Sequence, residues 1–279
     1  MINKLDLNKL SKKKLKLAVV GHVEWISFIS VDKLPKHGEI SHGEIYLETV
    51  AGGGAVTAIQ MNKKFNHQIE FFTALGRDKL GEICYEQLAE TGIKLNIAWK
   101  NEKTRKGISF LDQNSERSIT VIGKRLMPTS FDLLPWAKLK DFDGVFVSAT
   151  DTKGLNFCRR AKIMTITPRL GLEKIKKAGI FYDAIIGSDL DPEERFKSNE
   201  IKPMPKYCIR TRGKDGGISE PGGIYSPYKL NEKVIDSYGC GDSFAAGLTI
   251  GLAANLNLNQ AIDLGAYFGA KCACHLGPY

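Results

Sequence analysis

The chain has 279 residues, 43% hydrophobic and 25% charged, which is typical of a soluble globular protein with a substantial core, and its apolar runs fall far short of the roughly 20 residues that cross a bilayer. The basic stretch over residues 1–16 lacks the features of a secretory signal and the six cysteines are scattered, so we expect a flexible leader, no membrane partner and a cytoplasmic location. Much of the formal net charge of +9 comes from dispersed lysines and from the basic leader, without a nucleic-acid-binding motif. This favours a solvated surface over a nucleic-acid partner, and attraction to anionic substrates is compatible with it.

Strand and helix patterns then alternate along the chain. Strands are predicted over residues 14–21, 69–76, 144–149, 162–168, 184–188 and 206–213. Helices are predicted over residues 55–65 and 80–92, and a further helical pattern begins next to Asp242. This alternation predicts an α/β fold with a doubly wound, mainly parallel sheet flanked by helices.

Two segments have a different pattern. Residues 106–123 alternate around the turn DQNSE as a β-hairpin does, and residues 42–50 also have a period of two. We therefore predict a small β-sheet lid built from segments at about 36–50 and 95–123. The lid would belong to a single α/β domain over residues 17–279.

A glycine-rich turn precedes Asp242. Gly239, Cys240 and Gly241 stand where the helical pattern begins. Free N–H groups at a helix N-terminus favour an anion, and glycines let the backbone approach a phosphate closely. The carboxylate is suited to accept the proton of an attacking hydroxyl. A helix-capping aspartate is the alternative, and spacing alone does not decide between the two.

Several stretches together resemble the ribokinase family of carbohydrate kinases, also called the PfkB family. Residues 236–242, DSYGCGD, resemble the family signature D-T-x-G-A-G-D. Residues 19–39, AGGGAVTA from residue 51, ALGRDKLGE from residue 74 and TRGKDGG from residue 211 resemble further family motifs in the same order. The resemblance implies a ribokinase-like fold and an ATP-dependent phosphotransferase that phosphorylates a hydroxyl of a sugar or related small polyol.

The resemblance also implies roles for individual residues. Asp242 would be the general base, and the amides of Gly239, Cys240 and Gly241 would form an anion hole. Gly52 and Gly53 would lie against the acceptor, and we expect Glu24 and Trp25, from their own chemistry, to bind it beside them. A carboxylate can accept hydroxyl hydrogen bonds and a tryptophan can stack on a sugar ring, although Trp25 also fits a core position on a buried strand.

Nucleotide and metal sites are implied as well. The loop that would contact ATP contains Thr211, Arg212, Gly213 and Gly216, and a plain hairpin turn also explains its last glycines. Ser188 and Asp191 would help to organise Mg²⁺ and phosphate, where the family often has N-x-x-E. Dependence on a monovalent cation and a homodimer formed through the lid both stay open.

Two departures from the family pattern concern the acceptor. Ile26 stands where family members usually have a sugar-binding Asp, and Val56 stands where they usually have an Asn. We therefore expect a pocket more apolar than a ribose pocket, or one in which Glu24 has taken over the hydroxyl contact. A catalytically impaired binding or regulatory protein is the alternative function, and the intact turn at Asp242 favours the kinase.

Overall fold

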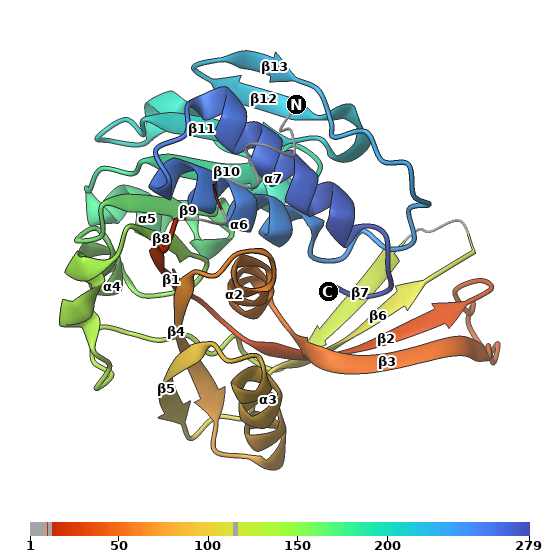
Figure 1. Cartoon of the computed structure of the whole chain (residues 1–279). Helices are drawn as coiled ribbons and strands as arrows, with labels where there is room; N and C mark the ends of the chain where they lie inside the picture. The colour runs from red at the N-terminus through yellow and green to blue at the C-terminus, as the bar shows by residue number, and fades with distance from the viewer. Residues whose placement is uncertain (1–9, 11–12, 114–116) are drawn as a thin grey trace.

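The structure, a computed structural model, describes residue 10 and residues 13–113 and 117–279. A nine-stranded main sheet carries helices on both faces, and a four-stranded sheet projects from one side (Figure 1). Most of the leader predicted over residues 1–16 lies outside the described residues, but the described Leu10 and Leu15 are buried against the core. Within the described ranges, no helix is both long enough and apolar enough to span a bilayer.

The main sheet has the strand order β13-β12-β11-β10-β9-β8-β1-β4-β5. Its parallel strands are β1 (Lys16–Val20), β4 (Gln68–Gly76), β5 (Lys94–Lys100), β8 (Gly144–Val147), β9 (Ile163–Ile166), β10 (Ala184–Ser188) and β11 (Tyr207–Thr211). The antiparallel strands β12 (Gly217–Glu220) and β13 (Gly223–Tyr225) complete one edge. The predicted doubly wound, mainly parallel sheet is confirmed.

Helices cover both faces of this sheet. One face carries α2 (Gly53–Lys64), α3 (Lys79–Glu90), α6 (Cys240–Ala253) and α7 (Leu258–Cys272). The other carries α4 (Thr152–Cys158), α5 (Leu172–Ala178) and the 3-10 turn η1 (Trp136–Asp141). Because successive strand side chains point to opposite faces, Leu17 of β1 packs in the first layer and Ala18 in the second.

Polar caps fix where two of these helices begin. The side chain of Asp78 accepts a hydrogen bond from the amide of Gly81 at 2.8 Å and caps α3. Asn257 and Gln260 form a capping box at the start of α7. Helices α2 and α6 begin instead at glycines with positive φ and have no side-chain cap from their own N-cap residue. At α2, His22 accepts hydrogen bonds from the amides of Gly53 and Ala55.

The smaller sheet is the predicted lid, with the order β3-β2-β6-β7. Its strands are β2 (Glu24–Val31), β3 (Gly43–Ala51), β6 (Lys106–Leu111) and β7 (Arg117–Ile122). β2 and β6 are parallel and the outer pairs are antiparallel.

The lid boundaries differ from the prediction in two places. Residues 24–31 form a lid strand, although apolar residues on both of its faces hide the period of two in the sequence. Residues 94–100 form β5 and pair with β4 in the main sheet. The middle of the predicted hairpin turn, residues 114–116, lies outside the described residues.

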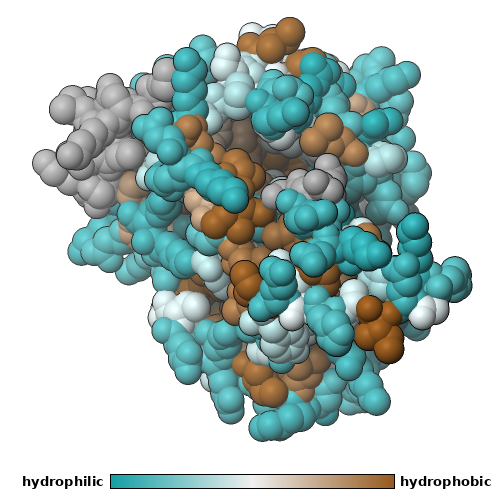
Figure 2. Space-filling model, turned by 90° about the vertical axis from the view of Figure 1, so that its right-hand side faces the viewer, coloured by the Kyte–Doolittle hydropathy of each residue, from teal (hydrophilic) through white to brown (hydrophobic). Residues whose placement is uncertain are grey.

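Seen from the side on which the lid projects, hydrophilic residues rim the molecule and hydrophobic residues gather toward the middle, where the surface is hollowed (Figure 2). The ends of the parallel strands and the lid lie on the same side of the main sheet (Figure 1). Ligands of open parallel sheets bind beyond the carboxyl ends of the strands. The expected ligand site is therefore the space between those strand ends and the lid.

Candidate active site

The glycine turn before Asp242 forms the N-terminus of α6. Gly239 is the N-cap residue, with a φ of 76° that glycine adopts at little cost. The amide of Cys240 donates to the carbonyl oxygen of Ser237 at 3.3 Å, whereas the amides of Gly241 and Asp242 have no acceptor among the described residues. Gly241 is exposed, and a Cβ built on it would meet nothing within 4 Å. The turn thus offers open N–H groups to an anion.

The carboxylate of Asp242 faces the first residue of α2. A Cβ built on Gly53 would lie only 2.9 Å from Asp242 Oδ1. The hydroxyl of Thr57 donates to the carbonyl oxygen of Gly53 at 2.8 Å and lies 3.3 Å from that of Asp242, which ties the two helix starts together. Because Gly239 is the N-cap and no side chain caps α6, the capping interpretation of Asp242 is wrong.

The surroundings of Asp242 favour its neutral form. Burial raises the pKa of its carboxyl to about 7, and the nearby carboxylates of Glu194 and Glu24 act in the same direction. The positive charges of Arg169 and Arg117 oppose this rise. A carboxylate whose pKa lies near the working pH can both accept and release a proton, as a general base requires.

The glycines before and in the first turn of α2 allow a close backbone approach. Gly52 has a φ of 89°, and a Cβ on it would lie 3.0 Å from the amide nitrogen of Glu24 and 3.1 Å from Cδ2 of His22. A Cβ on Gly54 would lie 2.7 Å from the carbonyl carbon of Gly21. Only glycines therefore let α2 begin directly against the ends of β1 and β2.

Two polar residues that the motifs do not reveal complete this region. His22 follows β1 and Ser148 follows β8, its neighbour in the sheet. His22 Nδ1 and Ser148 Oγ are buried and have no hydrogen-bond partner in the described structure. Buried polar atoms are nearly always paired, so these two are candidates for ligand contacts. In the sequence, both residues come just after a predicted strand, and this position is the feature that points to a ligand-binding role.

Glu24 is held as a charged group at the start of β2. Its Oε1 lies 3.0 Å from Nη1 of Arg105 and 3.4 Å from Nε2 of His22. Burial alone would raise the pKa of Glu24, but hydrogen bonding to His22 and the charges of Arg105 and Arg125 lower it. The structure thus brings Glu24 together with Gly52, Gly53 and Asp242, as the acceptor prediction requires.

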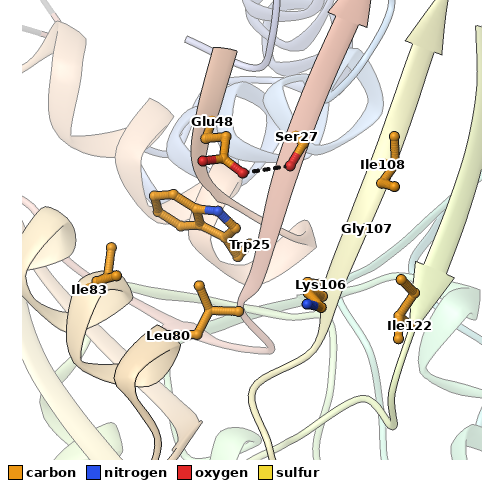
Figure 3. Close-up of a pocket in the computed structure, with 9 residues that line it drawn as sticks. All are labelled: Trp25, Ser27, Glu48, Leu80, Ile83, Lys106, Gly107, Ile108 and Ile122. Carbon is orange, nitrogen blue, oxygen red and sulfur yellow. Dashed lines mark hydrogen bonds between the residues drawn. The ribbon is translucent and has the colours of Figure 1, made fainter. Parts of the chain in front are cut away.

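Trp25 does not join this group. Because neighbouring residues of a strand point to opposite faces, Trp25 lies on the face of β2 away from Glu24. It lines a pocket of about 370 Å³ together with Ser27, Glu48, Leu80, Ile83, Lys106, Gly107, Ile108 and Ile122 (Figure 3). The expectation that Trp25 and Glu24 meet in one acceptor pocket is wrong. Trp25 instead belongs to the face of the lid that lies beside α3.

The predicted nucleotide loop follows β11. Thr211 ends this strand, and its hydroxyl donates to the carbonyl oxygen of Gly187 at 3.3 Å. Nε of Arg212 donates to Asp189 Oδ2 at 2.7 Å, so this guanidinium already has a carboxylate partner. Gly213 has a φ of 57° at the start of the short turn η5 (Gly213–Asp215).

Gly216 is required by the β11–β12 connection. It has a φ of 77°, and a Cβ on it would lie 2.1 Å from the carbonyl oxygen of Tyr225. The Tyr225 ring stacks on Phe244 of α6, with 6.1 Å between ring centroids. This stacking holds the loop beside the N-terminal turns of α6, so the turn role of Gly216 and a position near the anion-binding amides are compatible.

Ser188 and Asp191 have local partners in the structure. Ser188 Oγ accepts a hydrogen bond from the amide of Leu190 at 3.1 Å. Asp191 pairs with Arg169, whose Nε also contacts Glu194 Oε1 at 2.5 Å. The described ranges contain no group of three or more acidic, histidine or cysteine side chains that could hold a metal ion. Ser188 and Asp191 carry oxygen atoms of the kind that Mg²⁺ prefers, and each already has a protein partner.

Comparisons with known proteins agree with this geometry. The chain matches the pfkB family carbohydrate kinases over residues 14–163 and 184–279. It is 24% identical over 275 residues to the ribokinase of Lactococcus lactis subsp. lactis, which covers 94% of this chain and 90% of that protein.

Solved structures share the fold. The ribokinase of Cryptococcus neoformans var. grubii in complex with ADP has a TM-score of 0.72 and 20% identity, covering 95% of this chain and 96% of that one. The adenosine kinase of Sinorhizobium meliloti has a TM-score of 0.74 and 15% identity, with the same coverage. The fold is thus shared with a ribokinase that was solved with ADP and with an adenosine kinase. The chain belongs to the PfkB family of carbohydrate kinases, as its motifs indicate.

Proposed function

We propose that this enzyme transfers the γ-phosphoryl group of ATP to a hydroxyl of a sugar-like acceptor, with Asp242 as the general base. One observation carries the proposal: the Asp242 carboxylate caps no helix but faces Gly53, in surroundings that raise its pKa to about 7. An aspartate with only a structural role would gain nothing from surroundings that disfavour its charged form.

The chemistry assigns a role to each part of the α6 N-terminus. The acceptor hydroxyl would lie between Gly53 and Asp242, give its proton to the carboxylate and attack the γ-phosphorus, while the bond from phosphorus to the β–γ bridging oxygen breaks and ADP leaves. The open amides of Gly241 and Asp242 would stabilise the charge on the transferring group, and one such donor is typically worth about 3 kcal/mol. Base and anion hole belong to one turn, so they keep a fixed mutual position.

ATP would lie toward the β11–β12 hairpin, with its phosphates near Thr211 and Gly213. Mg²⁺ would enter with the phosphates and neutralise their charge, and Ser188 and Asp191 would contact its water shell. Arg169, whose charge reaches both Asp191 and Asp242, is well placed to balance the negative charge that gathers there. All six cysteines are free, which supports a cytoplasmic protein.

A second candidate function is a regulatory protein that binds a ligand without turnover. Its support is the apolar cluster in which Ile26 and Val56 pack together with Tyr238, because this cluster occupies the positions of two polar family residues. The kinase remains favoured, since the apolar cluster does not include Asp242 or the open amides of its turn.

The two functions are separated by measuring ADP release. The protein is incubated with Mg²⁺ and ATP, with and without each member of a panel of sugars, sugar phosphates, sugar acids and nucleosides. The kinase predicts ADP release only when magnesium and a hydroxylated acceptor are both present, and a rate lower by about 100-fold or more from Asp242→Asn. If ATP binds while no acceptor raises ADP release above background, the regulatory function replaces the kinase.

A further inference from the structure

Arginines on the acceptor side of the site carry more positive charge than the nearby carboxylates balance. Arg105 pairs with Glu24 at 3.0 Å. Arg125 forms no ion pair with any carboxylate of the described chain, and its Nη1 donates to the carbonyl oxygen of Arg169 at 3.0 Å. A guanidinium stays charged in proteins, so Arg125 is a surplus cation.

Both side chains also keep unused donors. The Nε atoms of Arg105 and Arg125 are buried and have no hydrogen-bond partner within the described residues. Burial and the positive charges of Arg105 and Arg169 lower the pKa of Arg125, and they outweigh the opposing charges of Glu24 and Glu193. Such an arrangement is unfavourable in the free protein and becomes favourable when an anion binds between the donors.

The two other arginines near Asp242 each lie beside a carboxylate, although Nη1 of Arg117 is also buried without a hydrogen-bond partner in the described structure. Arg169 is neutralised by Asp191 and Glu194. Arg117 lies 3.9 Å from Asp236 and against the ring of Tyr238. Among these four arginines, Arg125 is thus the one without a carboxylate ion pair in the described chain, and Arg105 lies close enough for its charge to act on Arg125.

These two arginines are connected to the reacting end of the site. Asp242 faces Gly53, the adjacent Gly52 lies against Glu24, and Glu24 contacts Arg105. The charge of Arg125 acts on both Glu24 and His22. A small molecule with its hydroxyl at Asp242 would therefore extend past Glu24 toward the two guanidinium groups.

We propose that the acceptor carries an anionic group, a phosphate ester or a carboxylate, in addition to the hydroxyl that is phosphorylated, and that Arg105 and Arg125 bind this group. The proposal rests on the proposed kinase function and names its substrate class. Guanidinium groups suit both anions because their paired N–H donors match two oxygens at once. Binding through charge also explains how the site tolerates Ile26 and Val56, since the hydroxyl contacts of a neutral sugar are then less needed.

The test is calorimetry without ATP, using matched pairs of small molecules that differ only in charge. Suitable pairs are ribose 5-phosphate with ribose, fructose 6-phosphate with fructose, and gluconate with glucose. At least one anionic member should bind roughly 30-fold or more tightly than its neutral partner, and raised salt should weaken it. The phosphate and acid pairs distinguish the two kinds of anion.

Variants assign this preference to the arginines. Arg125→Gln should weaken the anionic ligand roughly 30-fold and leave neutral sugars unchanged. Arg125→Lys keeps the charge and should retain most of the affinity, which controls for misfolding. Arg160→Gln is the matched control, because Arg160 is an exposed arginine that packs on Phe157 at the end of α4.

Equal affinity for the members of every pair, or no binding of any anionic member, would overturn the inference. An equal effect of Arg125→Gln on charged and neutral ligands would do the same. Failure of the kinase function looks different: an anionic ligand would bind tightly and depend on Arg125, yet no ADP would form with Mg²⁺ and ATP. Conversely, ADP release with neutral sugars alone would support the kinase and refute the anionic acceptor.

Discussion

The two halves of the space beneath the lid differ in polarity, although residues of the same strand, β2, line both of them. At the start of β2, Glu24 is a buried carboxylate that contacts Arg105. Two residues further along the same face, Ile26 is fully buried and packs in an apolar cluster with Val56 and Tyr238. One half can bind charged and hydroxylated groups, and the other excludes them.

This contrast explains the two substitutions that separate the chain from the family pattern. Ile26 and Val56 stand where the family motifs usually have an aspartate and an asparagine, and both belong to the same apolar cluster. The residues Leu276 and Tyr279, at the far end of the chain, pack against it. The two departures from the family pattern therefore belong to one apolar region, and Asp242 lies outside it.

The largest expected effect tests the polar half. Asp242→Asn keeps size and shape but removes the proton acceptor, so turnover on a validated acceptor should fall by about 100-fold to 10,000-fold. ATP affinity should stay equal or rise, because a negative charge near the γ-phosphate is gone. Steady-state kinetics and calorimetry measure both. Turnover within threefold of the wild type would show that the proton leaves by another route.

The same variant should be more stable than the wild type in mildly alkaline solution. The folded-state pKa of Asp242 is raised to about 7, so its neutral form stabilises the fold at low pH and this contribution is lost as pH rises through about 7. Asparagine never ionises, so its advantage above that pH should be on the order of 2 kcal/mol. Denaturant unfolding at acidic and alkaline pH provides the control, since the gain should vanish at low pH.

The next effect tests the apolar half. Ile26→Asp restores the family residue but places a carboxyl among Phe28, Val56 and Tyr238. The free energy of unfolding should fall by about 3 kcal/mol at neutral pH, with less loss in acid, where the carboxyl is protonated. Unchanged stability together with tighter binding of neutral sugars would mean that the apolar half accepts polar groups, and that the two halves do not differ in this respect.

A smaller effect concerns pH. Since the base must be ionised, kcat/KM should rise about tenfold per pH unit below pH about 7 and level off above it. Glu24, Glu194, Arg169 and Arg117 all act on this carboxyl, so bound ATP and acceptor will move the midpoint. A rate profile over about pH 5 to 9 measures it. A flat profile with chemistry as the slow step would exclude Asp242 as the base.

The smallest effect concerns the outer face of the lid. Trp25→Leu changes a side chain that lines the pocket beside α3, so the acceptor KM should change less than about twofold while stability falls by about 1 kcal/mol. Glu24→Gln, on the opposite face, should raise that KM markedly. Comparable KM changes in the two variants would mean that the acceptor reaches both faces of β2.

The sequence predicts the strand and helix order well, because periodicity and glycine stops are local signals. It also brings out Asp242 and its glycines, since close backbone approach needs glycine wherever it occurs. It does not reveal Arg105 or Arg125, which are ordinary charged residues beside lid strands and gain meaning only where the fold brings their charges near Glu24. It also does not separate Trp25 from Glu24, because adjacent residues of a motif lie on opposite faces when the motif forms a strand.

The close contact around Gly21 has a consequence for tolerated variation. A Cβ on Gly21 would lie 2.2 Å from Ser148 Oγ and 2.7 Å from the Cα of Gly54, so three chain segments meet there with no room for a methyl group. Saturation mutagenesis should therefore find Gly21 and Gly54 nearly invariant, although neither performs chemistry. In this enzyme, positions where chain segments pack without free space should tolerate substitution as poorly as the residues that take part in the reaction.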